Sequence, residues 1–276
     1  MEPITLATSA LLVGGVATRV TRNTEVRARF RTWLAAAPVV LIPLILLGPW
    51  GAVALASVLG VIAATEYARL SCLRRVDALL LAMVVGLLPV GILVNPLLTL
   101  ATVSLALPLG SAIAPVLHGD SFEGARRSAA TCFGIVWLGG GLAGIGLLEP
   151  AVAAAVCIAV AVADVGAWCG GRWLGRSGPL SKGLSSLSPS KTWAGVLGAA
   201  IAGTGVLALL GQLTPGLAIA VVVGGVLGDL VESMVKRCAR CKDAGTWLPG
   251  FGGLLDRIDS LLIALPLCLI LTGALA

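Results

Sequence analysis

Long apolar blocks constrain this sequence more than any other feature. Hydrophobic residues make up 58% of the 276 residues, whereas charged residues make up only 12%. An average soluble domain is about 25% charged, so this chain has too few charges to cover a soluble surface of its size. Several blocks reach the ~20 residues that a helix needs to cross a hydrocarbon core of ~30 Å. The sequence therefore predicts a multi-pass membrane protein.

The apolar blocks predict an all-α fold, a polytopic transmembrane helical bundle with about nine to ten membrane segments. In chain order they are residues 4–18, 33–49, 50–65, 78–94, 96–117, 128–148, 150–163, 193–211, 215–235 and 258–275. The first block has no basic residue before it and several after it, which is typical of an uncleaved segment. The blocks 50–65 and 150–163 are short, so they are expected to tilt, to extend into their loops or to sit inside the bundle.

The connections between the blocks alternate in charge. One set is short and almost uncharged, and the other set, with the helix ends beside it, holds all 19 Lys and Arg residues. The positive-inside rule places the basic set in the cytoplasm. The formal net charge of +6 fits this topology and anionic membrane lipids, and we expect no nucleic-acid partner.

Two polar stretches near the middle of the chain are candidates for substrate binding. Asp164 ends an apolar block and is followed by glycines and two arginines, although a Gly-rich helix end with snorkelling arginines would look the same. Ser188, Lys191 and Thr192 stand at the predicted start of a helix, where the dipole and free N–H groups favour phosphate. Taken alone, that second stretch is also compatible with an ordinary helix cap.

A third stretch, residues 228–260, is dense in mixed charge and glycine. Asp229 and Glu232 are spaced to share a helix face, and Asp256 and Asp259 repeat that spacing. Because an unpaired carboxylate inside a membrane is costly, Asp229 is functional by default. A divalent ion bridging Asp229 and Asp256 would compensate both charges and bind triphosphate oxygens. A salt-bridge network holding two helix ends is the alternative.

These motifs resemble the signature of the phosphatidate cytidylyltransferases, also called CDP-diacylglycerol synthases. The run S-M-V-K-R-x4-K-D-x-G-x3-P-G-x-G-G-L-x-D-R-I-D covers residues 233–259. D-x-G-A-W-x-x-G-R-x-x-G at 164–175 and S-P-S-K-T-W-x-G at 188–195 precede it in the family's order. The resemblance covers roughly residues 160–265, whereas the first 150 residues match only as hydrophobic helices.

The resemblance implies a reaction and a division of the chain. CTP and phosphatidic acid, or a related lipid phosphate, would give CDP-diacylglycerol and pyrophosphate, with Mg²⁺ required and K⁺ as a candidate to share the metal site. Residues 151–276 would form the catalytic region, facing the cytoplasm from a bacterial-type cell membrane. Residues 1–150 would be a transmembrane scaffold that faces lipid or a partner. Membrane lipids are expected partners, and a homodimer is left open.

The resemblance also implies roles for individual residues. Asp229 and Asp256 would be metal ligands, and Asp259 a further ligand or a lipid-site residue. The expected phosphate contacts are Lys236, Arg237, Lys242 and Arg257. The residues expected at the CTP and lipid pocket are Asp164, Ser188, Lys191, Thr192, Asp243 and Arg257.

The sequence departs from the family pattern at two positions. Phe251 replaces the usual His of P-G-H-G-G, and Ala194 replaces the acid or amide that usually follows K-T-W. Both changes remove polar groups and leave the carboxylates and basic residues intact, which favours a divergent subgroup over an inactive relative. Two alternative functions remain, a CTP-dependent kinase of a polyprenol or phytol and a membrane transporter.

Overall fold

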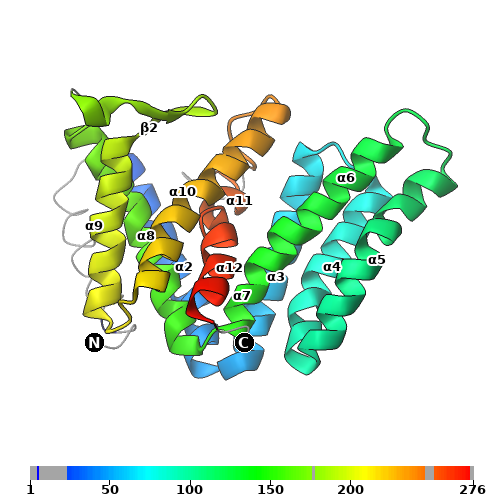
Figure 1. Ribbon diagram of the computed structural model, residues 1–276, viewed down its shortest axis with the longest axis horizontal. Helices are drawn as coiled ribbons and strands as arrows, with labels where there is room; N and C mark the ends of the chain where they lie inside the picture. Colours follow the sequence, from blue (N-terminus) through cyan, green and yellow to red (C-terminus); the bar gives the residue numbers. More distant parts are fainter. Residues whose placement is uncertain (1–4, 6–23, 176–177, 246–251, 274–276) are drawn as a thin grey trace.

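The computed structural model describes residues 5, 24–175, 178–245 and 252–273, and Figure 1 shows them as a bundle of helices. The N-terminal half contains α2 (Thr24–Leu46), α3 (Gly48–Leu70), α4 (Arg75–Val94), α5 (Pro96–Leu117), α6 (Gly124–Gly134), the π-helix η1 (Ile135–Gly140) and α7 (Gly141–Leu147). The C-terminal half contains α8 (Pro150–Trp173), the 3-10 turn η2 (Pro179–Ser181), β1 (Gly183–Ser185), β2 (Ser188–Thr192), α9 (Trp193–Leu209), α10 (Pro215–Cys238), α11 (Leu255–Ile258) and α12 (Leu261–Thr272).

The described residues confirm a mostly α-helical fold with several helices that could cross a membrane. Five helical segments are long and apolar enough to cross a membrane: α3, α4, the run Gly124–Leu147, α8 and α10. The bent α5 makes a sixth if it counts as one span. The larger number of nine to ten segments stays a prediction, since α9 and the apolar part of α2 are shorter than a span, and block 4–18 lies outside the described residues.

The two apolar blocks that are shorter than a span belong to longer helices. Block 50–65 lies within α3, which has 23 residues, and block 150–163 lies within α8, which has 24. Both helices continue into sequence that reads as a polar loop. Their extensions carry Glu66 and Asp164, respectively.

A small antiparallel hairpin, β1–β2, interrupts the helical pattern between α8 and α9. Gly183 pairs with Thr192 and Ser185 with Ser188. This polar segment lies between two apolar blocks and contains Pro189, which disfavours continuation of a helix. In Figure 1 the hairpin lies at the same end of the bundle as the C-terminal end of α10 and the start of α6.

Small residues let the helices of the C-terminal half approach backbone to backbone. α8 packs along α9, and α10 packs along α12. A Cβ atom on Gly198 would lie 2.2 Å from the Gly166 carbonyl oxygen, and one on Gly224 would lie 2.5 Å from the Ala264 Cα. Small residues at helix crossings are typical of membrane bundles, where association depends on close packing.

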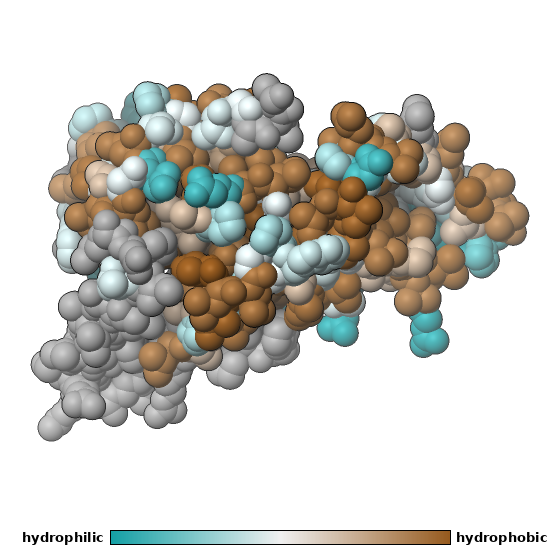
Figure 2. All heavy atoms as spheres, turned by 90° about the horizontal axis from the view of Figure 1, so that it is seen from below, coloured by the Kyte–Doolittle hydropathy of each residue, from teal (hydrophilic) through white to brown (hydrophobic). Residues whose placement is uncertain are grey.

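One buried ion-pair network ties the N-terminal helices together. The Arg127 side chain in α6 is 2% exposed and contacts Asp77 of α4 and Asp120, each at 2.6 Å. Elsewhere the molecule presents apolar side chains outward, and Figure 2 shows brown residues over much of the coloured face that it views. A charged group among such residues is tolerated because it is paired.

The close α10–α12 crossing predicts that a single added methyl group at this position destabilises the protein. Gly224→Ala places its Cβ against the α12 backbone, so we expect it to destabilise the protein by about 1–3 kcal/mol, the usual cost of overpacking. Gly205→Ala in α9 is the matched control, because nothing lies within 4 Å of that position. Thermal unfolding in detergent measures both, and equal melting temperatures for the two variants would contradict the close crossing.

Candidate active site

The C-terminal part of α10 presents charged side chains along one face. Asp229, Glu232 and Lys236 follow one another at intervals of three and four residues, which places them on the same side of a helix. Asp229 is half-buried, whereas Glu232 is only 1% exposed. The predicted shared face of Asp229 and Glu232 is therefore confirmed.

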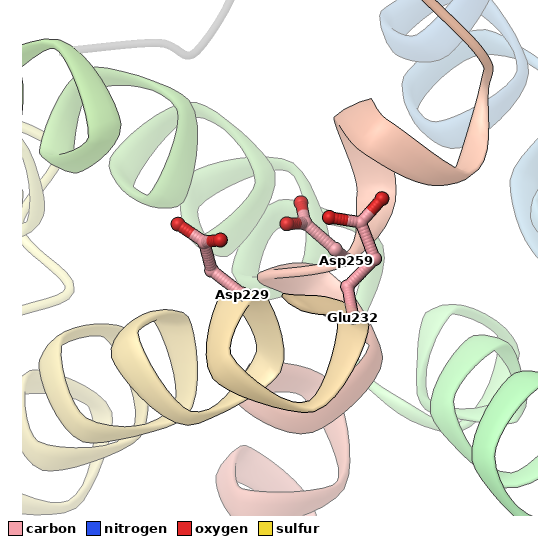
Figure 3. A group of neighbouring side chains, drawn as sticks. All are labelled: Asp229, Glu232 and Asp259. Carbon is pink, nitrogen blue, oxygen red and sulfur yellow. The ribbon is translucent and has the colours of Figure 1, made fainter. Parts of the chain in front are cut away.

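A glycine lets the chain before α12 lie directly against this face. A Cβ atom on Gly228 would lie 2.2 Å from the Asp259 carbonyl oxygen. Asp259 follows α11, and its side chain is buried. Figure 3 shows the carboxylates of Asp229, Glu232 and Asp259 turned toward a common space, and one oxygen of each lies within 4.8 Å of the others.

This carboxylate trio, Asp229, Glu232 and Asp259, fits a cation. Glu232 Oε1 is buried and has no hydrogen-bond partner among the described residues. Burial, together with the charges of Glu232 and Asp164, raises the pKa of Asp259 well above its ordinary value. Like charges held this close favour either protonation or a bound cation. Oxygen ligands of this kind suit a hard ion such as Mg²⁺.

Lys191 approaches the trio from the β-hairpin. Its ammonium group forms an ion pair with Asp229, and its side chain is 26% exposed. Burial lowers the pKa of Lys191, and the nearby carboxylates of Asp259, Asp164 and Glu232 oppose that effect. A desolvated ammonium group beside carboxylates is well placed to meet an anionic substrate.

Asp256 lies beside the trio but belongs to a different set of contacts. Its Oδ1 accepts a hydrogen bond from Lys236 Nζ at 2.8 Å, while Lys236 also contacts Glu232 at 2.5 Å. Its Oδ2 accepts from the backbone N–H groups of Ala244 at 2.9 Å and Gly253 at 2.8 Å. Burial would raise the pKa of Asp256, but its hydrogen bonds with Glu232, Lys236 and Gly253 outweigh that effect and lower it.

The structure thus arranges the predicted metal ligands differently from the bridged pair expected from the sequence. Asp229 and Asp259 share the trio, and Glu232 occupies the third place that the sequence analysis gave to Asp256. The spacing of Glu232 with Asp229 was visible in the sequence, but Glu232 was not among the predicted metal ligands. Four carboxylates, those of the trio and Asp256, surround two ammonium groups, Lys191 and Lys236. If all six groups are ionised, a net charge of about −2 remains, which one divalent cation would neutralise.

The other predicted residues lie around this centre at various distances. Asp164 adjoins Asp259 through Ser260, whose hydroxyl donates to Asp164 Oδ1 at 3.4 Å. Thr192 caps α9 by accepting from the Gly195 N–H at 3.2 Å, and Ser188 begins β2. Arg237 Nε donates to the Leu187 carbonyl at 3.5 Å, between β1 and β2. Lys242, Asp243 and Arg257 are exposed.

Of the two positions that depart from the family motif, the structure describes Ala194 but not Phe251. Ala194 is fully buried, and its carbonyl oxygen would lie 2.4 Å from a Cβ atom on Gly170, so it lies at the close α8–α9 crossing. A larger polar side chain there would need space and a partner inside the crossing. Phe251 lies outside the described residues.

The chain belongs to the cytidylyltransferase family, whose model matches residues 27–275. This confirms the family expected from the motifs. The chain is 42% identical over 116 residues to the phosphatidate cytidylyltransferase of Synechocystis sp. (strain ATCC 27184 / PCC 6803 / Kazusa), a match that covers 38% of this chain and 37% of that protein.

Two further relatives carry the same name. The phosphatidate cytidylyltransferase of Brucella suis biovar 1 (strain 1330) is 44% identical over 120 residues, which is 41% of this chain and 43% of that protein. The phosphatidate cytidylyltransferase of Mycobacterium leprae (strain TN) is 40% identical over 113 residues, 38% of this chain and 35% of that protein. The chain therefore matches less than half the length of each of these relatives.

The trio predicts a cation site that can be measured without substrate. Glu232→Gln removes the buried unpaired oxygen, and we expect it to weaken Mn²⁺ binding by at least about 10-fold, since even outer-shell changes typically cost that much. Electron paramagnetic resonance of free Mn²⁺ titrated with protein in detergent measures the affinity. Glu149→Gln, an exposed carboxylate before α8, is the control, and equal Mn²⁺ affinity in the two variants would exclude the trio as the site.

Proposed function

We propose that this chain transfers the cytidylyl group of CTP to phosphatidic acid or a related lipid phosphate, giving CDP-diacylglycerol and pyrophosphate for phospholipid synthesis. The observation that carries this proposal is the carboxylate trio flanked by Lys191 and Lys236 in a member of the cytidylyltransferase family. The names of the three relatives support the choice of substrates.

The residues that would hold Mg²⁺ are Asp229, Glu232 and Asp259. When bound there, Mg²⁺ would neutralise charge on the triphosphate and its pyrophosphate leaving group. A K⁺ ion sharing the site remains part of the proposal. Asp256, which the sequence placed among the ligands, would act at the same centre by holding the Lys236 ammonium group at 2.8 Å.

The chain's own groups account for binding and orientation of the reacting phosphates. An oxygen of the lipid phosphate attacks the α-phosphorus of CTP, the bond to the β-phosphate breaks, and pyrophosphate leaves. Catalysis of this kind depends mainly on positioning and charge stabilisation. Lys191 and Lys236, both held against carboxylates, would turn toward phosphate oxygens, and the exposed Arg237, Lys242 and Arg257 would attract the nucleotide.

The membrane arrangement supports a cytoplasmic site. The hairpin, the C-terminal end of α10 and the start of α6 lie at one end of the bundle in Figure 1, and these segments contain basic residues. By the positive-inside rule that end would face the cytoplasm, where CTP is available. The lipid phosphate would then enter from the adjoining leaflet, and a homodimer is compatible with this orientation.

Product analysis tests the reaction itself. Purified protein with CTP, Mg²⁺ and phosphatidic acid in mixed micelles is expected to form CDP-diacylglycerol and pyrophosphate in equal amounts. In a parallel reaction with a polyprenol or phytol in place of phosphatidic acid, a lipid kinase would instead give the phosphorylated alcohol with CDP. A transporter would give neither product, and either of those results would overturn the proposal.

Asp256→Asn tests the role of the signature carboxylate. Asparagine keeps the size of the side chain but removes the charge that holds Lys236, so we expect turnover to fall by about 10²–10³-fold, as for loss of one transition-state stabilising group. Pyrophosphate release measures turnover, and size-exclusion chromatography confirms that the variant is folded. Glu149→Gln should keep normal turnover, and a near-normal rate in Asp256→Asn would remove Asp256 from the site.

A further inference from the structure

Glu66 is a buried carboxylate outside every motif of the catalytic half. It lies in α3, in the N-terminal half that the sequence analysis treated as scaffold, and its residue exposure is 2%. Burial of a charged group is costly unless hydrogen bonds or opposite charges compensate it. The partners of Glu66 therefore indicate what this residue does.

The carboxylate of Glu66 binds the backbone of the loop that carries Asp256. Oε1 accepts a hydrogen bond from the Leu254 N–H at 2.9 Å, and Oε2 accepts one from the Leu255 N–H at 2.7 Å. These partners are 188 and 189 residues apart from it in sequence. Hydrogen bonds to an ionised carboxylate are among the stronger ones in proteins.

Two motif glycines enclose the same carboxylate. A Cβ atom on Gly245 would lie 2.7 Å from Glu66 Oε1, and one on Gly253 would lie 2.7 Å from both oxygens. The loop backbone thus approaches Glu66 from two sides at positions where a side chain would collide with it. This gives a physical reason for glycine at both positions of the signature.

A continuous series of contacts connects Glu66 to the carboxylate trio. Gly253 donates to Asp256 Oδ2, Asp256 Oδ1 accepts from Lys236, and Lys236 contacts Glu232. Leu254 and Leu255, the residues held by Glu66, lie between Gly253 and Asp256 in the chain. A shift of this backbone would move Asp256 and release Lys236.

We propose that Glu66 is a positioning residue for the signature loop, and that its carboxylate holds the 253–255 backbone so that Asp256 can fix Lys236 beside the trio. Its effect on catalysis rests on the proposed cytidylyltransferase function, whereas its effect on the loop does not. Glu66 acts through Asp256 and has no direct part in the reaction.

Limited proteolysis tests the effect on the loop without substrate. Glu66→Gln keeps the shape but replaces one acceptor with an NH₂ donor that faces a backbone N–H. Loss of a charge-assisted hydrogen bond should raise tryptic cleavage after Arg240 or Lys242 by about 10- to 100-fold. Cleavage after Lys182, an exposed residue next to the hairpin, is the internal reference and should not change.

Steady-state kinetics tests the effect on catalysis. In Glu66→Gln we expect kcat to fall by about 10- to 100-fold, with a much smaller change in the KM for phosphatidic acid. Gly245→Ala keeps the carboxylate but displaces it through its Cβ atom, and it should shift cleavage and kcat in the same direction. Asp77→Asn changes a buried carboxylate that pairs with Arg127, and it should lower the melting temperature without changing either readout.

The outcomes separate this inference from the proposed function. If the wild type makes no CDP-lipid, the proposed function fails, while faster loop cleavage in Glu66→Gln still supports the hold on the loop. If the wild type is active and Glu66→Gln matches it in kcat or in loop cleavage, the positioning role is overturned. A fall in kcat that Asp77→Asn reproduces at equal folded protein would also overturn it, because the effect would then be general destabilisation.

Discussion

The cost of placing charge inside an apolar bundle governs the arrangement of this molecule. Arg127 is compensated by Asp77 and Asp120, and Glu66 by two backbone N–H groups. At the trio, carboxylates outnumber nearby ammonium groups, and one buried oxygen of Glu232 has no partner among the described residues. The local excess of negative charge favours a bound cation at this place in the fold, and the proposed phosphate chemistry depends on such a cation.

The helices were predictable because hydrophobicity alone specifies them. Each apolar block from 33–49 to 215–235 lies mostly within one helix or, for 128–148, within the continuous run of α6, η1 and α7, and block 258–275 contains α12. The spacing of Asp229 and Glu232 also correctly predicted that they share one face of a helix. Of the three alternatives left open for the short blocks 50–65 and 150–163, the structure shows extension, because the polar last turns of α3 and α8 are still helical. The hairpin was missed because two short polar strands carry no periodic signal.

Contacts between distant segments account for the part of the site that the sequence did not predict. Nothing local distinguishes Glu66 from any acidic residue at a helix end, because its partners lie in another half of the chain. The contacts of Asp256, which was assigned to the metal from its spacing with Asp259 and from the family motif, were not visible in the sequence: its oxygens accept hydrogen bonds from Lys236 and from the Ala244 and Gly253 N–H groups. Glycines at 228, 245 and 253 make these approaches possible, and their effect depends on what lies opposite each of them.

The series of contacts from Glu66 to the trio gives the N-terminal helices a role beyond filling the membrane. The family match begins at residue 27 and so includes α3, although the motifs that suggest chemistry all lie beyond residue 160. Leu254 and Leu255 pack with the main core, but apolar packing is not directional and does not by itself fix the backbone in one position. Two hydrogen bonds from a helix fixed in the main core provide that restraint at a defined position. The N-terminal helices and the candidate site are therefore connected directly, because the buried Glu66 carboxylate of one half accepts hydrogen bonds from the backbone of the other.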